Sequence, residues 1–433
     1  MSSSHHSSAS KVTTLILLAI LILTSALRVP LANAQAVTAT VTVGSFPYGV
    51  AYDSGKGEVF VANRDSDNVS VISDSTNSVV ATIKLGGSPF GVAYDPARGE
   101  VFVAVSTTNT VVVISDANNS IIARIKLPVG TGPQGLVYDS ARGEVFVTDF
   151  VSGNVSVISD SSNTVVATIG LGGGPFGTFG PYEAAYDSGK GEIFVANGYG
   201  TNSVSVISDR TNKIVANVTV GDDPFGVAYD PSKGEVFVTD GGDTNVSVIS
   251  DSTNSVIATV IGVGFYDAVY DSARGEVYVS NGGDTNGVSV ISDSNNSVVA
   301  TINIDGGVGL AYDSGKGEVF VANSDNNTVT VISDAAPVST TTATSATSPS
   351  PTTQTSMPSS TSTITPVTST NTGIAESTTI QTSTTSSASG IPEFPYLSIA
   401  AALFTVLLCM SYLLIRRRKS PQPGLARQTP NRK

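Results

Sequence analysis

The chain has 433 residues, enough for two or three average domains or for one large all-β domain. Only 13% of its residues are charged, and Gly, Ser, Thr, Val and Asn fill the sequence, a composition that favours strands and turns and argues against long amphipathic helices. Residues 35–334 hold 33 Asp and Glu against 13 Lys and Arg, so this region repels phosphate backbones, which excludes nucleic acid as an expected partner.

Residues 1–34 are typical of a secretory signal peptide. A polar start ends at Lys11, the apolar run LILLAILIL extends from Leu15 to Leu23, and small residues around Ala34 form a cleavage site. The alternative is an uncleaved N-terminal anchor. In both cases we expect the chain that follows to be translocated out of the cytoplasm.

A repeat of about 42 residues occupies the middle of the chain. The dipeptide Tyr-Asp occurs seven times, at intervals of 41 to 48 residues, at Tyr52-Asp53, Tyr94-Asp95, Tyr138-Asp139, Tyr186-Asp187, Tyr229-Asp230, Tyr270-Asp271 and Tyr312-Asp313. The tripeptide Ile-Ser-Asp also occurs seven times, from Ile72 to Ile332. This period is typical of the four-stranded blade of a β-propeller.

One repeat illustrates the expected strands. Residues 90–95, 100–105, 110–116 and 120–127 are apolar or alternating runs rich in Val, Ile and Phe. Gly, Pro, Asn and Asp separate these runs, as turns require. We therefore expect an all-β fold in which each repeat forms one four-stranded sheet.

The two ends of the repeat region complement each other. The last repeat stops after residues 329–334 and lacks its fourth strand, whereas residues 39–43 form a fourth strand that precedes the first repeat. Pairing the two would close a ring and remove an exposed sheet edge. The sequence thus predicts a seven-bladed β-propeller over residues 37–334, with an open solenoid as the structural alternative.

The C-terminal part is typical of a stalk and an anchor. Residues 335–390 are rich in Ser, Thr, Pro and Ala, and they predict a disordered stalk of the kind that is often O-glycosylated. Residues 396–415 are long and apolar enough for one transmembrane helix, which contains the single cysteine, Cys409. Residues 416–433 are basic and predict a cytoplasmic tail, so we expect a single-pass protein with its propeller at the cell surface.

The second expected strand of each repeat carries a tetrapeptide motif. It reads Tyr278-Val279-Ser280-Asn281 in the sixth repeat, FVAN from Phe60, Phe194 and Phe320, FVTD from Phe146 and Phe237, and departs from this pattern at Val105 in the repeat of Phe102. The repeat resembles the YVTN-type β-propeller family of archaeal cell-surface proteins over residues 37–334. The resemblance implies a propeller and a surface or extracytoplasmic role, and it says little about a ligand.

The most regular motif is Lys or Arg followed by Gly-Glu, from Lys56-Gly57-Glu58 in the first repeat to Lys316-Gly317-Glu318 in the last. We interpret it as a hairpin turn, in which the preceding Asp accepts backbone hydrogen bonds, the Gly takes a positive φ, and the charged side chains lie at the surface. Residues 35–334 contain no His, Cys or Trp, so chemistry that relies on His for metals or proton transfer loses its main residue. We expect no catalytic residue, no metal ligand and no cofactor.

Departures from the repeat gather in loops that would share one face of a propeller: those joining the second and third strands, and those leading from each fourth strand into the next repeat. The candidate binding residues there are Asp65, Asp67, Tyr182, Asp222, Asp223, Asp240, Asp243, Tyr266, Asp284, Asp305 and Asp325. An acidic and aromatic face suits sugars, basic peptides or Ca²⁺. The alternative is that Asp and Gly are ordinary loop residues and that the aromatic side chains fill gaps between blades.

The repeat region also contains seven Asn-x-Ser/Thr sequons, which are candidate N-glycosylation sites in a translocated protein. They are Asn68, Asn118, Asn154, Asn217, Asn245, Asn295 and Asn326.

Together these features predict a membrane-anchored extracellular propeller that acts as a non-enzymatic binding, adhesion or envelope-scaffold module, with an extracellular glycan or protein as its partner. Two alternatives remain open. One is an extracytoplasmic, lactonase-like enzyme that uses carboxylates and a divalent cation. The other is a subunit of a surface layer.

Overall fold

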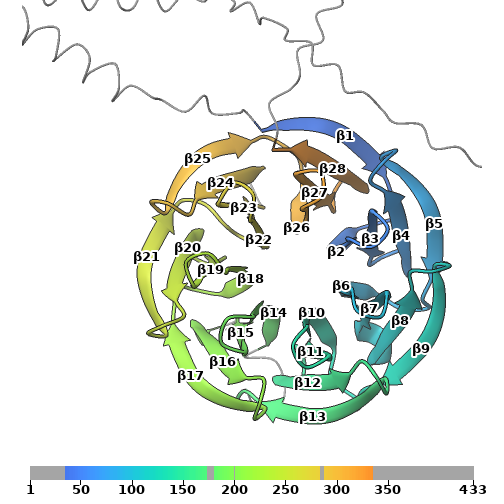
Figure 1. Cartoon of the computed structure of the whole chain (residues 1–433), viewed down its shortest axis with the longest axis horizontal. Helices are drawn as coiled ribbons and strands as arrows, with labels where there is room; N and C mark the ends of the chain where they lie inside the picture. The colour runs from blue at the N-terminus through green and yellow to red at the C-terminus, as the bar shows by residue number, and fades with distance from the viewer. Residues whose placement is uncertain (1–34, 173–179, 199, 283–286, 335–433) are drawn as a thin grey trace, which may run out of the picture. The chain divides into compact units, whose positions relative to one another are not determined.

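The computed structural model describes residues 35–172, 180–198, 200–282 and 287–334. The expected signal peptide, stalk, transmembrane helix and basic tail lie outside these residues, as does Asp284. Within the described ranges, no helix is long and apolar enough to span a membrane. The described residues form seven four-stranded antiparallel sheets arranged as the blades of a ring (Figure 1), so the expected all-β, seven-bladed propeller is confirmed.

Each blade runs from an inner strand at the channel to an outer strand at the rim (Figure 1). Blade 1 contains β2 (Pro47–Asp53), β3 (Glu58–Asn63), β4 (Asn68–Ser73) and β5 (Ser78–Lys84). Blade 2 contains β6 (Pro89–Asp95), β7 (Glu100–Val105), β8 (Thr110–Ser115) and β9 (Ser120–Lys126), with the short 3₁₀ helix η1 (Ser106–Thr108) between β7 and β8. Blade 3 contains β10 (Pro133–Asp139), β11 (Glu144–Asp149), β12 (Asn154–Ser159) and β13 (Thr164–Gly170). Blade 4 contains β14 (Pro181–Asp187), β15 (Glu192–Asn197), β16 (Ser203–Ser208) and β17 (Lys213–Thr219).

The remaining blades follow the same order. Blade 5 contains β18 (Pro224–Asp230), β19 (Glu235–Asp240), β20 (Asn245–Ser250) and β21 (Ser255–Ile261). Blade 6 contains β22 (Ala268–Asp271), β23 (Glu276–Ser280), β24 (Val288–Ser292) and β25 (Ser297–Ile302). Blade 7 contains β26 (Gly307–Asp313), β27 (Glu318–Asn323) and β28 (Thr328–Ser333), and its outer strand is β1 (Ala36–Thr42).

The N-terminal strand closes the ring, as the sequence predicted. β1 runs antiparallel to β28, with Thr40 opposite Thr330 and Val41 opposite Val329. Val41 is 5% exposed and packs in one cluster with Phe320 of blade 7 and Val59 of blade 1. Pairing therefore removes the open edge that blade 7 would otherwise present.

The core lies between neighbouring sheets. Each second strand places one large aromatic side chain in full burial, namely Phe60, Phe102, Phe146, Phe194, Phe237, Tyr278 and Phe320. The surrounding clusters combine Val and Ile from two adjacent blades; Phe60 of blade 1, for example, shares a cluster with Val101 and Val103 of blade 2. Each such aromatic side chain contributes about 1.5–3 kcal/mol of hydrophobic stabilisation, which holds blade against blade.

The repeated Tyr-Asp dipeptide also joins adjacent blades. Asp53 is fully buried, and its Oδ1 accepts the backbone N–H groups of Gly55 and Lys56 at 2.8 and 3.1 Å. Tyr94 of the next blade directs its hydroxyl towards Asp53 and donates to Asp116 Oδ2 at 3.3 Å. Burial, together with these two aspartates, raises the pKa of Tyr94. The dipeptide is therefore a structural element of the fold.

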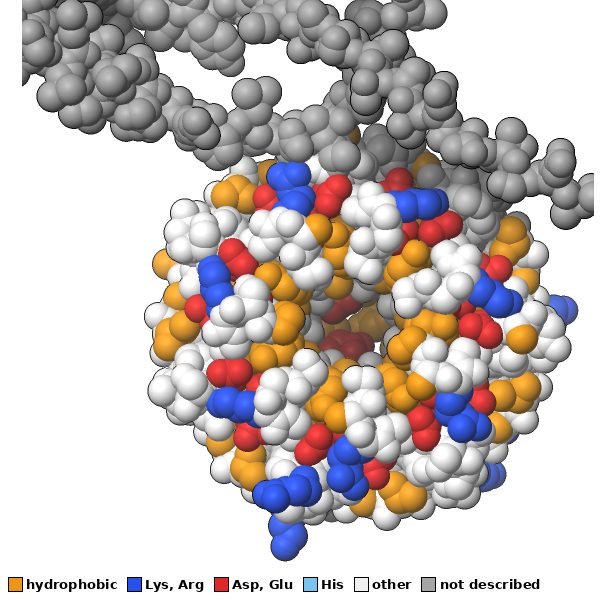
Figure 2. Space-filling view, in the orientation of Figure 1, with side chains coloured by type: hydrophobic (Ala, Val, Ile, Leu, Met, Phe, Trp, Pro, Cys, Tyr) orange, Lys and Arg blue, Asp and Glu red, His pale blue; other side chains and the backbone are white. Residues whose placement is uncertain are grey.

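Two faces of the ring follow from the strand order. We call the side with the turns between inner and second strands, such as residues 54–57, the turn face, and the side with residues 64–67 and their equivalents the loop face. Figure 2 shows the turn face, where Lys and Arg side chains lie beside acidic ones around a central hollow. The glycines of the Lys/Arg-Gly-Glu motif have positive φ, as expected. The glutamates are less exposed than predicted, since six of the seven are half-buried and one, Glu100, is buried. Glu100 is 7% exposed, because the first residue of a second strand lies between two other strands.

Candidate site in the central channel

Two blades depart from the others at the third residue of the inner-strand motif. Five blades carry glycine there, at Gly49, Gly91, Gly135, Gly226 and Gly309, whereas blade 4 has Glu183 and blade 6 has Asp267. Glycine is favoured because adjacent inner strands approach closely: a Cβ added at Gly49 would overlap the carbonyl oxygen of Phe90, and one at Gly309 that of Tyr48. An acidic side chain at this position therefore needs local adjustment of its neighbours.

Threonine hydroxyls from the preceding blades hold both Tyr-acid pairs. In blade 3, Thr148 accepts a hydrogen bond from the N–H of Gly135 at 2.7 Å and donates to the carbonyl oxygen of Tyr182 at 2.6 Å. In blade 5, Thr239 donates to the carbonyl oxygen of Tyr266 at 2.8 Å. Both threonines belong to the FVTD variants of the second-strand motif, so these variants occur directly before the two acidic blades.

Asp267 is fixed by backbone donors. Its Oδ1 accepts the N–H of Ala268 and its Oδ2 accepts the N–H of Leu310 in blade 7, each at 2.8 Å. Burial raises the pKa of Asp267 to about 6, although both N–H groups oppose the shift. The two bonds hold the carboxylate in one orientation and leave each oxygen a second acceptor site.

Glu183 and Tyr48 complete the group. Burial, followed by the charge of Asp267, raises the pKa of Glu183 well above its usual value. Burial raises the pKa of Tyr48 too, with smaller contributions from Glu183, Tyr266 and Asp267, so these groups lie within electrostatic reach of one another. Neither the Glu183 carboxylate nor the Tyr48 hydroxyl has a hydrogen-bond partner among the residues that the structure describes. Both side chains are half-buried. They belong to β2 and β14, which line the channel (Figure 1), so part of their surface still reaches solvent.

Aromatic rings flank these acids on the side of the loop face. Phe150 and Tyr182 have ring centroids 5.0 Å apart, Tyr182 stacks on Phe225 at 3.9 Å, and Phe225 meets Tyr266 edge-on at 5.5 Å. We call this continuous series across blades 3 to 6 the aromatic arc. These contacts join the loop-face ends of four neighbouring blades through packed aromatic rings.

A cavity of about 490 Å³ lies on the turn-face side of the channel. Its lining comes from the inner strands of blades 3 to 6: Val137, Tyr138, Ala184, Ala185, Tyr186, Ser188, Val227, Ala228, Tyr229, Pro231, Ala268, Val269 and Tyr270. Glu183 and Asp267 immediately precede the lining residues Ala184 and Ala268, and acidic side chains are visible deep in the hollow (Figure 2). The cavity thus combines a small apolar wall with several tyrosines, and two of its lining residues directly follow Glu183 and Asp267 in the chain.

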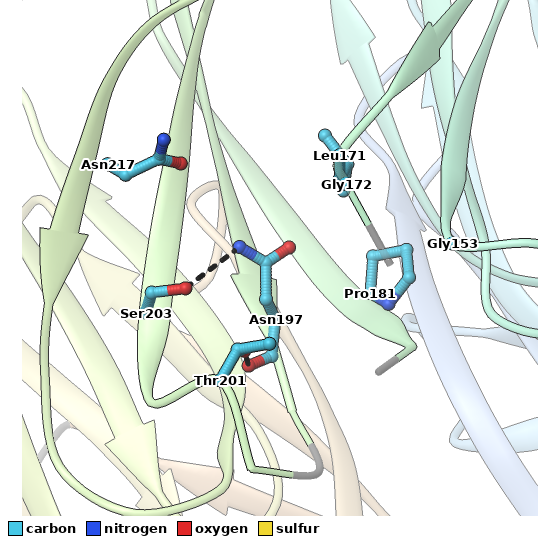
Figure 3. Close-up of a pocket in the computed structure, with 8 residues that line it drawn as sticks. All are labelled: Gly153, Leu171, Gly172, Pro181, Asn197, Thr201, Ser203 and Asn217. Carbon is cyan, nitrogen blue, oxygen red and sulfur yellow. Dashed lines mark hydrogen bonds between the residues drawn. The ribbon is translucent and has the colours of Figure 1, made fainter. Parts of the chain in front are cut away.

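A second pocket of about 250 Å³ lies on the loop face between blades 3 and 4 (Figure 3). It is lined by Gly153, Leu171, Gly172, Pro181, Asn197, Thr201, Ser203 and Asn217. Asn197 donates to Ser203 Oγ at 3.3 Å, so its polar groups already bond to one another in part. Because its polar groups are partly paired and no charged side chain lines it, this pocket is a weaker candidate than the channel.

The residues proposed from the sequence do not form a single site. Asp65, Asp67, Asp222, Asp243, Asp305 and Asp325 are exposed on the loop face, distributed over several blades, and Asp223 is half-buried there. Asp240 is fully buried at the end of β19, where Ser247 donates to it at 2.6 Å. Of the proposed residues, only Tyr182 and Tyr266 lie near the channel residues Tyr48, Glu183 and Asp267. Within the described ranges, no three His, Cys, Asp or Glu side chains could hold a metal ion together.

Glu183 and Asp267 are not among the residues predicted from the sequence. A signal was present, since aligning the seven repeats on Tyr-Asp shows glycine four residues before Asp in five of them and an acid in the other two. Its meaning depends on the close approach of inner strands, which a single repeat does not reveal.

Fold and channel place the described region in the class of seven-bladed β-propellers. No protein-family model matches the chain, and none of the curated proteins matches it. Among solved structures, 1771 chains are similar, and one of them is from Kuenenia stuttgartiensis hydrazine synthase. That chain is 17% identical with a TM-score of 0.59, and the alignment covers 68% of this chain and 97% of that chain. At this identity the likeness shows the fold alone.

Proposed function

We propose that the protein is a membrane-anchored extracellular module of the YVTN type that binds a ligand in its central channel and carries out no reaction itself. The observation that carries this proposal is the replacement of glycine by Glu183 and Asp267 in two of seven otherwise regular blades. A residue common to all blades maintains the blade, whereas a departure that places a charge inside a channel costs free energy and needs another explanation. Ligand binding provides one.

The rest of the molecule supports a binding role. The apolar wall of the cavity, its few polar groups and its volume match those of small-ligand sites, which are typically about 300–1,000 Å³. The expected signal peptide, stalk and anchor would present such a module to extracellular glycans or proteins.

A binding screen tests this proposal. The full chain and the double variant Glu183→Gln/Asp267→Asn would be screened against arrays of envelope glycans and surface-protein peptides. We expect a ligand that the wild-type chain retains and the double variant loses. Retention of the same ligands by both proteins, with unchanged thermal stability, would contradict a channel site.

The enzymatic alternative has one observation in its favour, since two carboxylates with raised pKa values lie near each other in a channel. Lactone hydrolysis by the full chain, with and without Ca²⁺, distinguishes the two functions. Turnover that depends on Ca²⁺ and disappears in Asp267→Asn would replace the binding proposal with a lactonase-like one.

A further inference from the structure

Two oxygen-bearing groups of the channel, the Glu183 carboxylate and the Tyr48 hydroxyl, can accept hydrogen bonds from a ligand. Glu183 of blade 4 and Tyr48 of blade 1 make no hydrogen bond with the described residues, although protein surrounds both. Asp267 of blade 6 has accepting capacity left on each oxygen. Polar groups that protein largely surrounds lose much of their hydration, so Glu183 and Tyr48, together with the accepting capacity left on Asp267, favour a ligand that donates hydrogen bonds to them.

A primary ammonium group fits this arrangement. It carries three N–H donors and no acceptor, one donor for each of the three oxygen-bearing side chains.

A calcium ion fits less well. Ca²⁺ takes six to eight oxygen ligands, whereas Asp267 already accepts two backbone hydrogen bonds. The nearby carbonyl oxygens of Tyr182 and Tyr266 accept from Thr148 and Thr239. Among the described residues no set of three acidic, His or Cys side chains is close enough to share a metal.

The wall of the cavity favours an aliphatic stem behind the ammonium group. Ala184, Val227, Ala228, Ala268 and Val269 form the apolar part of its lining. From Glu183 to Ser188 the inner strand extends about 16 Å at ~3.3 Å per residue, longer than an extended lysine side chain.

We propose that the channel binds the terminal ammonium group of an aliphatic primary amine, with Glu183, Asp267 and Tyr48 as its acceptors and the alanine and valine wall against its stem. This inference rests on the proposed function and names the ligand chemistry of the same site. A free alkylamine and a lysine side chain present the same group, and the experiment distinguishes them.

Isothermal titration of the full chain at pH 8 tests the proposal with four probes. They are n-pentylammonium, its uncharged counterpart 1-pentanol, N-acetyl-lysinamide and Ca²⁺. We expect n-pentylammonium to bind at least about tenfold more tightly than 1-pentanol, because hydrogen bonds to a charged group are the stronger kind. Binding of N-acetyl-lysinamide as well would identify lysine side chains as ligands, and its failure beside a bound alkylamine would identify free amines.

Substitutions locate the site. Glu183→Gln and Asp267→Asn should each weaken n-pentylammonium binding by about tenfold or more, and Tyr48→Phe by a few fold. Glu144→Gln is the matched control, since Glu144 pairs with Arg142 away from the channel, and it should leave the affinity unchanged. Glu183→Gly, which installs the residue of the other blades, provides a second test if the glutamine variant does not fold.

Three results would overturn the inference: no binding of either amine by the folded wild-type chain, equal binding of 1-pentanol, or amine binding that none of the channel substitutions changes. The screen could also find a glycan or peptide that the double variant no longer binds, while neither amine binds. That result would support the proposed function and contradict only the inference that the ligand is an amine.

Discussion

At the scale of single residues, Asp149 and Asp240 show how one repeat position can carry different chemistry. They end the second strands of blades 3 and 5, where Asn63, Asn197, Asn281 and Asn323 stand in blades 1, 4, 6 and 7. Both carboxylates are fully buried, and one oxygen of each has no hydrogen-bond partner among the described residues. Burial raises the pKa of each to about 7, with a single serine hydroxyl as the main opposing contact.

These two groups make stability depend on pH. Their folded-state pKa lies above the unfolded value of about 3.9, so their contribution to stability is full below pH 4 and is lost as pH rises through 7. We expect Asp149→Asn/Asp240→Asn to raise the free energy of unfolding at pH 8 by on the order of 1–4 kcal/mol per group, with little effect at pH 4. Calorimetric melting between pH 4 and pH 8 measures this, with Asp65→Asn as an exposed control. Equal pH dependence of wild type and double variant would show that burial does not shift these groups.

At the scale of elements, the strands were predictable because the same pattern of apolar runs and turn residues recurs in seven repeats. The expected runs 90–95, 100–105, 110–116 and 120–127 correspond to β6, β7, β8 and β9 within one residue at each end. The three channel residues Tyr48, Glu183 and Asp267 were not predictable in this way. They come from blades 1, 4 and 6, and they come within electrostatic reach of one another only when the ring closes.

The closing strand β1 provides the test at this scale. Removing residues 35–43 deletes the six residue pairs between β1 and β28 and exposes the edge of β28. We expect such a chain to lose several kcal/mol of stability and to melt at least about 10 °C lower than a chain that begins at Gln35. Differential scanning calorimetry of the two truncated chains makes the comparison. Equal melting temperatures would mean that the pairing of β1 contributes little to ring closure.

At the scale of the whole molecule, the fold sorts the seven sequons into two groups. Asn118, Asn217, Asn295 and Asn326 are exposed, whereas Asn68, Asn154 and Asn245 are the half-buried first residues of β4, β12 and β20. The amide of Asn68, for example, donates to the carbonyl oxygen of Ser66 at 2.9 Å, and that of Asn154 donates to Ser152 at 3.2 Å. A glycan on either amide nitrogen would disrupt these contacts.

We therefore expect glycans on the four exposed sequons and not on the three strand-initial ones when the chain is secreted by a cell that N-glycosylates exported proteins. Glycopeptide mass spectrometry measures the occupancy of each site. Occupancy at Asn68, Asn154 and Asn245 equal to that of the exposed group would contradict the sorting by burial, and no occupancy at any sequon would count against translocation.

The sequence by itself determined the number of blades, the order of strands and the origin of the closing strand. The first two depend on local periodicity. The third follows because the last repeat lacks its fourth strand and an extra strand precedes the first repeat. The tertiary structure decided which departures from the repeat matter. Asp325 is an exposed loop residue, whereas Glu183 and Asp267 occupy the position at which, in the other five blades, a Cβ would overlap the backbone of the next inner strand. That distinction depends on the distance between blades, which is a property of the closed ring and of no single repeat.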